Sequence, residues 1–279
     1  MNASLSLVRP SARSFPVANA VVPGQTDSAS KRFRLPPFPG RMPAENPACR
    51  PHPGQRGMKG EKNNTQPTSA DTVVVLDFET TGLSPDLGER PIEVGAVLVE
   101  AGRIIDRFQS LMNPGKRINS FIEGYTGISN AMVRKAPPCA EVMAEFAQFI
   151  QTHNLVAHNA SFDQKFLDAE FGRINCQRQG DFACSMLISR RIYPDAPNHK
   201  LGTLVGYKRL KSDGIFHRAL ADAEMAAHLW VALLGDIENR YRISSIPFPV
   251  MRKLARTPKA SIDPWLWQYS RSHPAQGMK

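Results

Sequence analysis

The chain has few cysteines and no long apolar run. Four of its 279 residues are cysteine and none forms a Cys-x-x-Cys pair, which argues against a zinc ribbon or a disulfide scaffold. No stretch approaches the ~18 apolar residues of a membrane span, so we expect no membrane partner. Hydrophobic residues make up 42% and charged residues 22%, which excludes wholesale disorder and a collagen-like chain. We expect a globular protein in a reducing compartment, the cytoplasm.

Acidic residues are scarce at the N-terminus. Residues 1–70 hold ten basic residues against Asp27, Glu45 and Glu61, a net +7 of the chain's +10, and eleven of its 23 prolines. This composition predicts a disordered, basic, Pro-rich segment. It weakly resembles an organelle transit peptide, and an equally good interpretation is that the native chain begins at Met58. The overall pI of about 9.7 favours a polyanionic partner.

Apolar patterns from Thr72 onward predict alternating strands and helices. We expect strands at 73–76, 92–99, 103–111 and 154–158, and helices at 140–152, 161–171 and 219–236. An opening hairpin followed by this alternation predicts an α/β sandwich on a mixed sheet. We therefore divide the chain into the segment 1–70, a domain at 71–236, and a basic C-terminal tail at 237–279, where the pattern weakens.

Two acidic residues end the first buried strand. Asp77 and Glu79 lie two residues apart, so their carboxylates share one face of the sheet and repel each other. That arrangement is favourable if a cation lies between them; the alternative is that the strand has surfaced and both are solvated. Thr80, Thr81 and Gly82 follow, and these are also ordinary turn formers.

Two further acidic residues lie at predicted helix starts. Asp163 opens a helix, where its carboxylate also suits the positive helix end. His217 and Asp222 are five residues apart, so on one ideal helix they would point about 140° apart. Their side chains converge only if His217 lies in the loop before the helix and Asp222 lies inside it.

The four carboxylates together favour one chemistry. Hard oxygen ligands suit Mg²⁺ or Mn²⁺, and two such ions would balance four negative charges. Two metal ions bound side by side stabilise an in-line displacement at phosphorus. An imidazole, with an ordinary pKa near 6.5, can take a proton from the attacking water, and His217 is the candidate. The set therefore predicts phosphodiester hydrolysis.

Three motifs carry a family resemblance. Asp77-Phe78-Glu79-Thr80-Thr81-Gly82-Leu83, His158-Asn159-Ala160-Ser161-Phe162-Asp163 and His217-Arg218-Ala219-Leu220-Ala221-Asp222-Ala223 resemble the three motifs of the DEDDh exonuclease superfamily, which includes the epsilon proofreading subunit of bacterial DNA polymerase III. The resemblance covers roughly residues 72–234. It implies an RNase H-like fold, with a mixed five-stranded sheet flanked by helices, and metal-dependent 3'-to-5' exonuclease activity.

The resemblance also implies residue roles. Asp77, Glu79, Asp163 and Asp222 match the metal ligands, for two Mg²⁺ or Mn²⁺ ions, and His217 matches the general base. Candidate substrate contacts are Thr80, Thr81, Gly82, Leu83, His158, Asn159 and Phe162. For His158 a satisfied core histidine is the competing interpretation, and for Phe162 it is packing.

The partner is expected to be the 3' end of a nucleic acid, DNA in preference to RNA. A polymerase partner stays open, because no clamp-binding or polymerase-binding segment is recognisable. The alternatives are an RNA-trimming exoribonuclease, a non-catalytic nucleic-acid-binding module and a polymerase accessory protein. The sequence leaves the oligomeric state and the choice of metal undecided.

Overall fold

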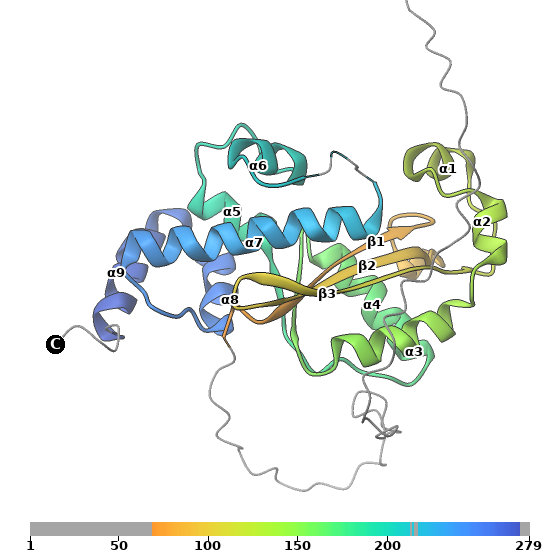
Figure 1. The fold of residues 1–279 in the computed structure, drawn as a ribbon, viewed down its shortest axis with the longest axis horizontal. Helices are drawn as coiled ribbons and strands as arrows, with labels where there is room; N and C mark the ends of the chain where they lie inside the picture. Colours follow the sequence, from red (N-terminus) through yellow and green to blue (C-terminus); the bar gives the residue numbers. More distant parts are fainter. Residues whose placement is uncertain (1–68, 213, 215–216, 274–279) are drawn as a thin grey trace, which may run out of the picture. The chain divides into compact units, whose positions relative to one another are not determined.

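The computed structural model describes residues 69–212, 214 and 217–273 (Figure 1). The disorder expected for residues 1–70 thus falls almost entirely outside the described residues. The last two residues of that segment are described, and they pair with the C-terminal region. Ser69 forms a β-bridge with Pro247, and the Ala70 N–H donates to the carbonyl of Ile246. These two residues therefore belong with the folded domain.

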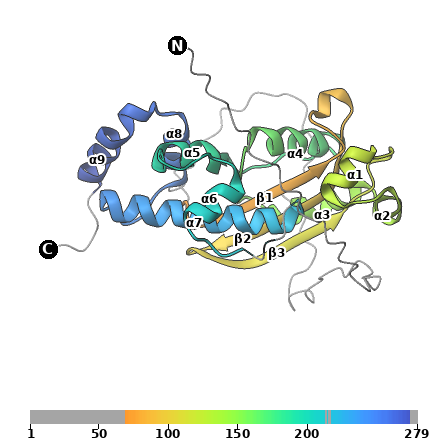
Figure 2. The same cartoon turned by 90° about the horizontal axis from the view of Figure 1, so that it is seen from above.

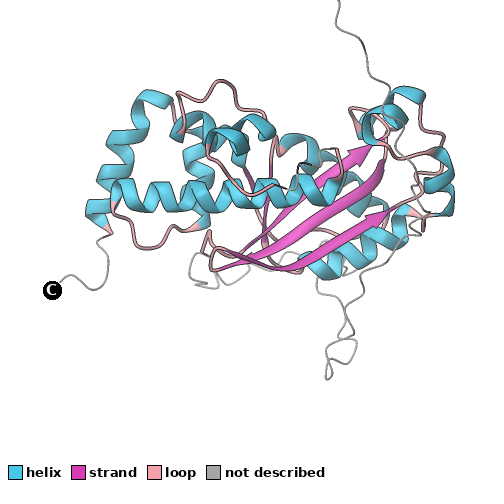
Figure 3. Cartoon of the chain, turned by 45° about the horizontal axis from the view of Figure 1, so that its top comes forward, coloured by secondary structure: helices cyan, strands magenta, loops and turns pink. Residues whose placement is uncertain are grey.

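Within the described residues, five strands form one sheet in the order β3-β2-β1-β4-β5. Figure 3 draws the strands in magenta and the helices around them in cyan. Their bounds are β1 Val73–Thr80, β2 Pro91–Glu100, β3 Arg103–Leu111, β4 Asn154–Ala157 and β5 Phe182–Cys184. β1, β2 and β3 pair antiparallel, whereas β1–β4 and β4–β5 pair parallel. The expected mixed five-stranded sheet with flanking helices is confirmed.

The helices include the three that the sequence predicts. Their bounds are α1 Ser120–Thr126, α2 Asn130–Lys135, α3 Cys139–Ile150, α4 Ser161–Arg173, α5 Ser185–Ile192, α6 Leu201–Tyr207, α7 Ala219–Tyr241, α8 Phe248–Arg256 and α9 Ile262–Ser272, with 3₁₀ turns η1 Pro85–Leu87 and η2 Lys259–Ser261. Among the described helices, none combines the length and apolar character needed to cross a membrane.

The alternation of β1 sets up the site. Val73 and Val75 pack in one core cluster with residues of α7, including Trp230. Val74 and Leu76 pack in another cluster, with residues of α3 and α4. α7 thus covers one face of the sheet and α3 and α4 the other (Figure 1), and Figure 2, seen from above, shows α7 lying over the strands. Because side chains alternate along a strand, the acids that follow Val75 on its face are carried toward α7.

The C-terminal region differs from the expected tail. α7 continues to Tyr241, and α8 and α9 follow it. On α8 the residues Phe248, Met251 and Leu254 recur every three positions and are buried in the same core cluster as Trp230. This short apolar stripe is interrupted by basic residues, which is why the pattern reads as weak along the sequence. Residues 237–273 extend the core beyond the boundary that we expected at 236.

Candidate active site

Four carboxylates from three elements meet at one end of the sheet. Asp77 and Glu79 lie at the C-terminal end of β1, and Asp163 and Asp222 lie in the first turns of α4 and α7. Asp163 is 2% exposed, and its Oδ1 accepts a hydrogen bond of 3.2 Å from the N–H of Phe78. Because β4 runs parallel to β1, the helix that follows β4 begins beside the end of β1.

These carboxylates repel one another in a partly dry environment. Burial, then Asp163, Asp222 and the other acids nearby, raise the pKa of Asp77 well above its usual range. Burial, followed by the charges of Asp222 and Glu93, raises the pKa of Glu79 to about 8. Burial also raises the pKa of Asp163 to about 8, against the opposing effect of its hydrogen bond from Phe78. The site therefore binds protons at a pH where isolated carboxylates are ionised, and a cation would relieve the same repulsion.

His217 and Asp222 converge as the loop-and-helix arrangement requires. His217 precedes α7 and has a φ of +62°, a left-handed conformation that is uncommon outside glycine, and its N–H donates to Asp222 Oδ2 at 2.9 Å. Ligand atoms of Glu79, His217 and Asp222 all lie within 4.8 Å of one another. A single divalent cation would reach all three.

An ion pair between a buried glutamate and a partly exposed arginine fixes the start of α7. Glu93 on β2 is 0% exposed and lies opposite Glu79 in the sheet. Its carboxylate accepts from Arg218 Nη2 at 2.8 Å and Nε at 3.1 Å, and from the Ala219 N–H at 3.2 Å. Our reading of the sequence missed this pair. The signal was a lone glutamate inside the apolar run 92–99, which is rarely buried without a partner.

Close contact between β2 and α7 depends on Gly95, which pairs with Asp77 in the sheet. A Cβ at Gly95 would lie 2.0 Å from the Leu220 nitrogen and 2.2 Å from the Ala219 carbonyl carbon. We expect Gly95→Ala to push the first turn of α7 away from β1, lowering kcat/KM at least ~10²-fold, since misplacement by about 1 Å can have that effect. Overpacking should also lower the free energy of unfolding by roughly 1–3 kcal/mol.

Gly235→Ala on the same helix is the matched control, because a Cβ there meets nothing within 4 Å. This control should keep full activity and gain up to about 1 kcal/mol of stability, since alanine favours a helix. Steady-state rates and urea unfolding of both variants check the prediction. Equal activity of Gly95→Ala and Gly235→Ala would show that the close approach does not position the acids.

The turn after β1 is held by its two threonines. Thr80 and Thr81 are 7% and 4% exposed. Thr80 Oγ1 donates to the Gly82 carbonyl at 2.6 Å, and Thr81 Oγ1 donates to Glu89 and accepts from the Arg90 N–H. This network leaves Leu83 84% exposed beside the acids. The threonine hydroxyls therefore shape the turn, and Leu83 is the side chain there that is free to meet a substrate.

The second motif places its three candidates differently. His158 Nδ1 lies 3.0 Å from Ser185 Oγ and Nε2 lies 2.9 Å from the His199 carbonyl, and burial lowers the pKa of His158 to about 4. These contacts favour the core interpretation of His158. Phe162 packs on Phe166, with ring centroids 5.0 Å apart. Asn159 has a φ of +74° and its carbonyl accepts from the Phe162 N–H at the entry to α4.

An aromatic group that the sequence did not single out borders His217. The ring centroids of Tyr125, on α1, and His217 lie 4.0 Å apart. Phe121, one turn earlier on α1, stacks on Tyr125 with ring centroids 5.9 Å apart and an interplanar angle of 10°. Phe121 and Tyr125 are 73% and 53% exposed. Their four-residue spacing within a polar segment was the available signal. Exposed stacked rings beside the acidic cluster suit contacts with nucleobases.

The donor set fits hard divalent cations. It consists of carboxylates with one imidazole, and burial and mutual repulsion raise the pKa values of Asp77, Glu79 and Asp163. The protein's own cations offset little of this repulsion. Arg218 lowers the pKa of Glu79, but its guanidinium is already paired with Glu93. The residues present therefore match a site that cations complete.

Metal should stabilise the fold more as pH rises. Carboxyls whose pKa is raised on folding, such as Glu79, favour the metal-free fold at pH below about 4, and this contribution is lost as pH rises to about 8. Mg²⁺ at ~100-fold its Kd adds roughly 2.7 kcal/mol, or about 5–10 °C in Tm for a domain of this size. We expect that gain at pH 8.5 and almost none at pH 5.5. Thermal melts with Mg²⁺ or with EDTA check it, and an equal gain at both pH values would contradict it.

The sequence matches the exonuclease family model RNase_T over residues 74–230. The 3'-5' exonuclease DinG of Bacillus subtilis (strain 168) is 35% identical over 187 residues, 66% of this chain and 19% of DinG. A PolC-type DNA polymerase III of Caldanaerobacter subterraneus subsp. tengcongensis is 36% identical over 166 residues, 60% of this chain and 12% of the polymerase. The chain thus spans no more than 19% of either relative.

Solved structures share the fold. Exonuclease X in complex with 5' overhanging duplex DNA has a TM-score of 0.53 and 24% identity, over 66% of this chain and 99% of that one. The nuclease domain of 3'hExo, a DEDDh family member bound to rAMP, has a TM-score of 0.53 and 21% identity, over 60% of this chain and 92% of that one. These likenesses confirm the RNase H-like fold that the motifs implied. The family model matches more than half of the residues of this chain, and the chain therefore belongs to the exonuclease family.

Proposed function

We propose that this protein is a metal-dependent 3'-to-5' exonuclease that hydrolyses the terminal phosphodiester of a DNA strand, single or frayed, and releases nucleoside monophosphates. The observation that carries the proposal is the convergence of four carboxylates and His217 at one end of the sheet. A protein that only bound nucleic acid would gain nothing from four acids beside a polyanion. The sequence is 35% identical to DinG, which is described as a 3'-5' exonuclease, and this similarity supports the proposed direction of hydrolysis.

The proposed cofactors are two Mg²⁺ or Mn²⁺ ions held by Asp77, Glu79, Asp163 and Asp222. When bound, they would supply positive charge for the attacking and leaving oxygens of the displacement. Hard carboxylate ligands favour these ions over zinc. Asp163 is held in place by the Phe78 N–H, and Asp222 by the N–H that it accepts from His217.

The side chains of this protein supply the remaining steps. His217 is proposed to accept the proton of the attacking water, and the Tyr125 ring at 4.0 Å limits where the imidazole can turn. Leu83, which is 84% exposed, is proposed to contact the terminal base. Tyr125 and Phe121 would stack with bases that enter the site, in a way that tolerates any sequence. Thr80, Thr81 and Gly82 shape the turn beneath them, while Asn159 and Phe162 shape the entry to α4.

The polymerase context comes from relatives. Several PolC-type DNA polymerases resemble this chain, which favours DNA as the substrate and keeps a polymerase partner as a proposal. Ribonucleotide trimming is the second candidate, because Tyr125 and Phe121 would stack with RNA bases equally well. We propose the cytoplasm as the location, which cell fractionation would test.

One assay tests the function. The purified protein is incubated with 5'-end-labelled single-stranded DNA or RNA, with Mg²⁺ or with EDTA, and product lengths are followed over time. We expect a ladder that shortens one nucleotide at a time from the 3' end, faster on DNA, only with metal. Faster trimming of RNA would select the second candidate. Internal cuts, or no cleavage with Mg²⁺ or Mn²⁺, would refute the exonuclease.

A further inference from the structure

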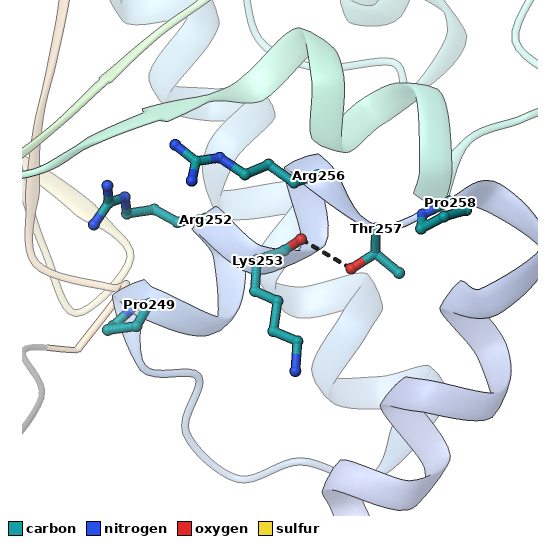
Figure 4. A pocket seen from close by; sticks show the side chains of 6 residues that line it. All are labelled: Pro249, Arg252, Lys253, Arg256, Thr257 and Pro258. Carbon is teal, nitrogen blue, oxygen red and sulfur yellow. Dashed lines mark hydrogen bonds between the residues drawn. The ribbon is translucent and has the colours of Figure 1, made fainter.

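A basic pocket lies on α8, beyond the last residue of the family match at 230. Figure 4 shows its lining, which is Pro249, Arg252, Lys253, Arg256, Thr257 and Pro258. The cavity measures about 490 Å³, within the ~300–1,000 Å³ usual for small-molecule sites. Three of the six lining side chains are cationic and none is acidic, so the pocket suits an anion.

The basic residues are not needed for the packing of α8. Phe248, Met251 and Leu254 bury the inner side of the helix. Lys253 and Arg256 are exposed, and they lie in the last turn with Arg252 close by. Because burial of the apolar stripe already holds the helix on the domain, the outward cations are free to serve another role.

The positive charge of the pocket is poorly compensated. Arg252 pairs with Asp181 through Nη1, but its Nε is buried without a hydrogen-bond partner. Lys253 lies over the Trp265 ring, 4.9 Å from the centroid. Within the described part of the chain, no carboxylate lies within ion-pair distance of Lys253 or Arg256. Cations this close repel one another, because they lie well within a Debye length of ~10 Å at 0.1 M salt.

A fourth cation binds the backbone of Thr257, one of the residues that line the pocket. Arg191 on α5 donates from Nε to the Thr257 carbonyl and from Nη1 to the Leu187 carbonyl, both at 2.7 Å. Thr257 Oγ1 in turn donates to the Lys253 carbonyl at 2.9 Å. These bonds fix the turn after α8, and among the residues that the structure describes no carboxylate forms an ion pair with Arg191.

The pocket lies far from the catalytic acids. α8 follows directly on Pro247, which pairs with Ser69 just before β1 begins, whereas Asp77 and Glu79 lie where β1 ends. Eight residues at ~3.3 Å each separate the two ends of the strand by roughly 25 Å. An occupant of both sites must be a long polymer that carries phosphates along its length.

We propose that the pocket on α8 binds phosphates of a nucleic-acid strand whose 3' end lies at the catalytic acids. Arginine and lysine are the groups that most often contact phosphate oxygens without reading sequence. The inference rests on the proposed function for the identity of the polymer. It predicts that long strands bind more tightly than short ones, through contacts outside the family domain.

Binding tests this without turnover. Full-length Asp77→Asn protein, in EDTA, is titrated with labelled single-stranded DNA of about 30 or about 6 nucleotides by fluorescence anisotropy. Adding Lys253→Gln and Arg256→Gln removes two phosphate contacts. For the long strand, the slope of log Kd against log salt concentration should therefore fall by about 1.4. At 0.1 M salt this corresponds to a Kd about 25-fold weaker. Binding of the short strand should not change. This readout is independent of whether the wild-type protein is an exonuclease.

Arg103→Gln with Arg242→Gln is the matched control, since both arginines are exposed and lie outside the pocket. This control should leave the affinity for the long strand within about twofold. An equal loss of long-strand affinity in the control and in the pocket variant would mean that only net charge matters, and it would overturn the proposal. A salt slope that does not change in the pocket variant would overturn it too. Unchanged long-strand binding in the pocket variant, together with tighter binding of labelled poly-glutamate by the wild-type protein than by the variant, would overturn the proposal and assign the pocket to an acidic protein.

Discussion

Asp77→Asn should abolish nuclease activity and, without metal, make the protein more stable at pH 8. The amide cannot replace a charged ligand, and losing several kcal/mol of transition-state stabilisation lowers the rate by ~10³-fold or more. The stability gain has a separate cause. Burial and the charges of Asp163 and Asp222 raise the pKa of Asp77, so its ionised form disfavours folding above pH ~4, and the neutral amide removes that effect.

Rates on end-labelled DNA and thermal melts in EDTA at pH 8 measure the two effects together. Asp195→Asn is the matched control, because Asp195 is exposed outside the site, and it should change neither quantity. Retained activity with Mg²⁺ would remove Asp77 from the ligand set. A lower Tm in EDTA would show that the carboxylate stabilises the metal-free fold, against the repulsion described above.

His217→Ala should lower kcat by roughly 10²–10⁴, the usual contribution of a general base. Metal ions can be kept saturating, so the loss should appear in kcat and not in metal affinity. A general base acts only in its deprotonated form, so any rise of the wild-type rate with pH should flatten in the variant. Added free imidazole should restore part of the rate.

His228→Ala provides the comparison for this prediction, because His228 lies on α7 without a place in the acidic cluster. It should keep the wild-type rate and pH profile. An unchanged pH profile in His217→Ala, or rescue that imidazole does not give, would mean that another group accepts the proton.

Local patterns allowed most of the domain to be predicted. Alternation in β1 placed Asp77 and Glu79 on one face, and the five-residue spacing between His217 and Asp222 required the loop before α7 that the structure has. The resemblance of the motifs supplied the RNase H-like fold, which the solved structures confirm. These features depend on neighbours along the chain, and the sequence displays such neighbours directly.

What the sequence did not show depends on distant contacts. Glu93 and Arg218 are 125 residues apart, and only the approach of α7 to β2 makes them a pair. Tyr125 gains its meaning from the His217 ring, which lies on another element. The expected tail at 237–279 contains α8, whose single turns of apolar residues are too short to recognise without the core that they cover.

One cluster of carboxylates is proposed to hold divalent ions for phosphodiester hydrolysis. Diffraction from crystals of the protein soaked in Mn²⁺, collected at an energy where manganese scatters anomalously, tests it most directly. We expect anomalous peaks among Asp77, Glu79, Asp163 and Asp222, which disappear in crystals of Asp77→Asn. Mn²⁺ bound only elsewhere, or no peak at these acids at pH 8, would show that the four carboxylates do not hold the metal ions.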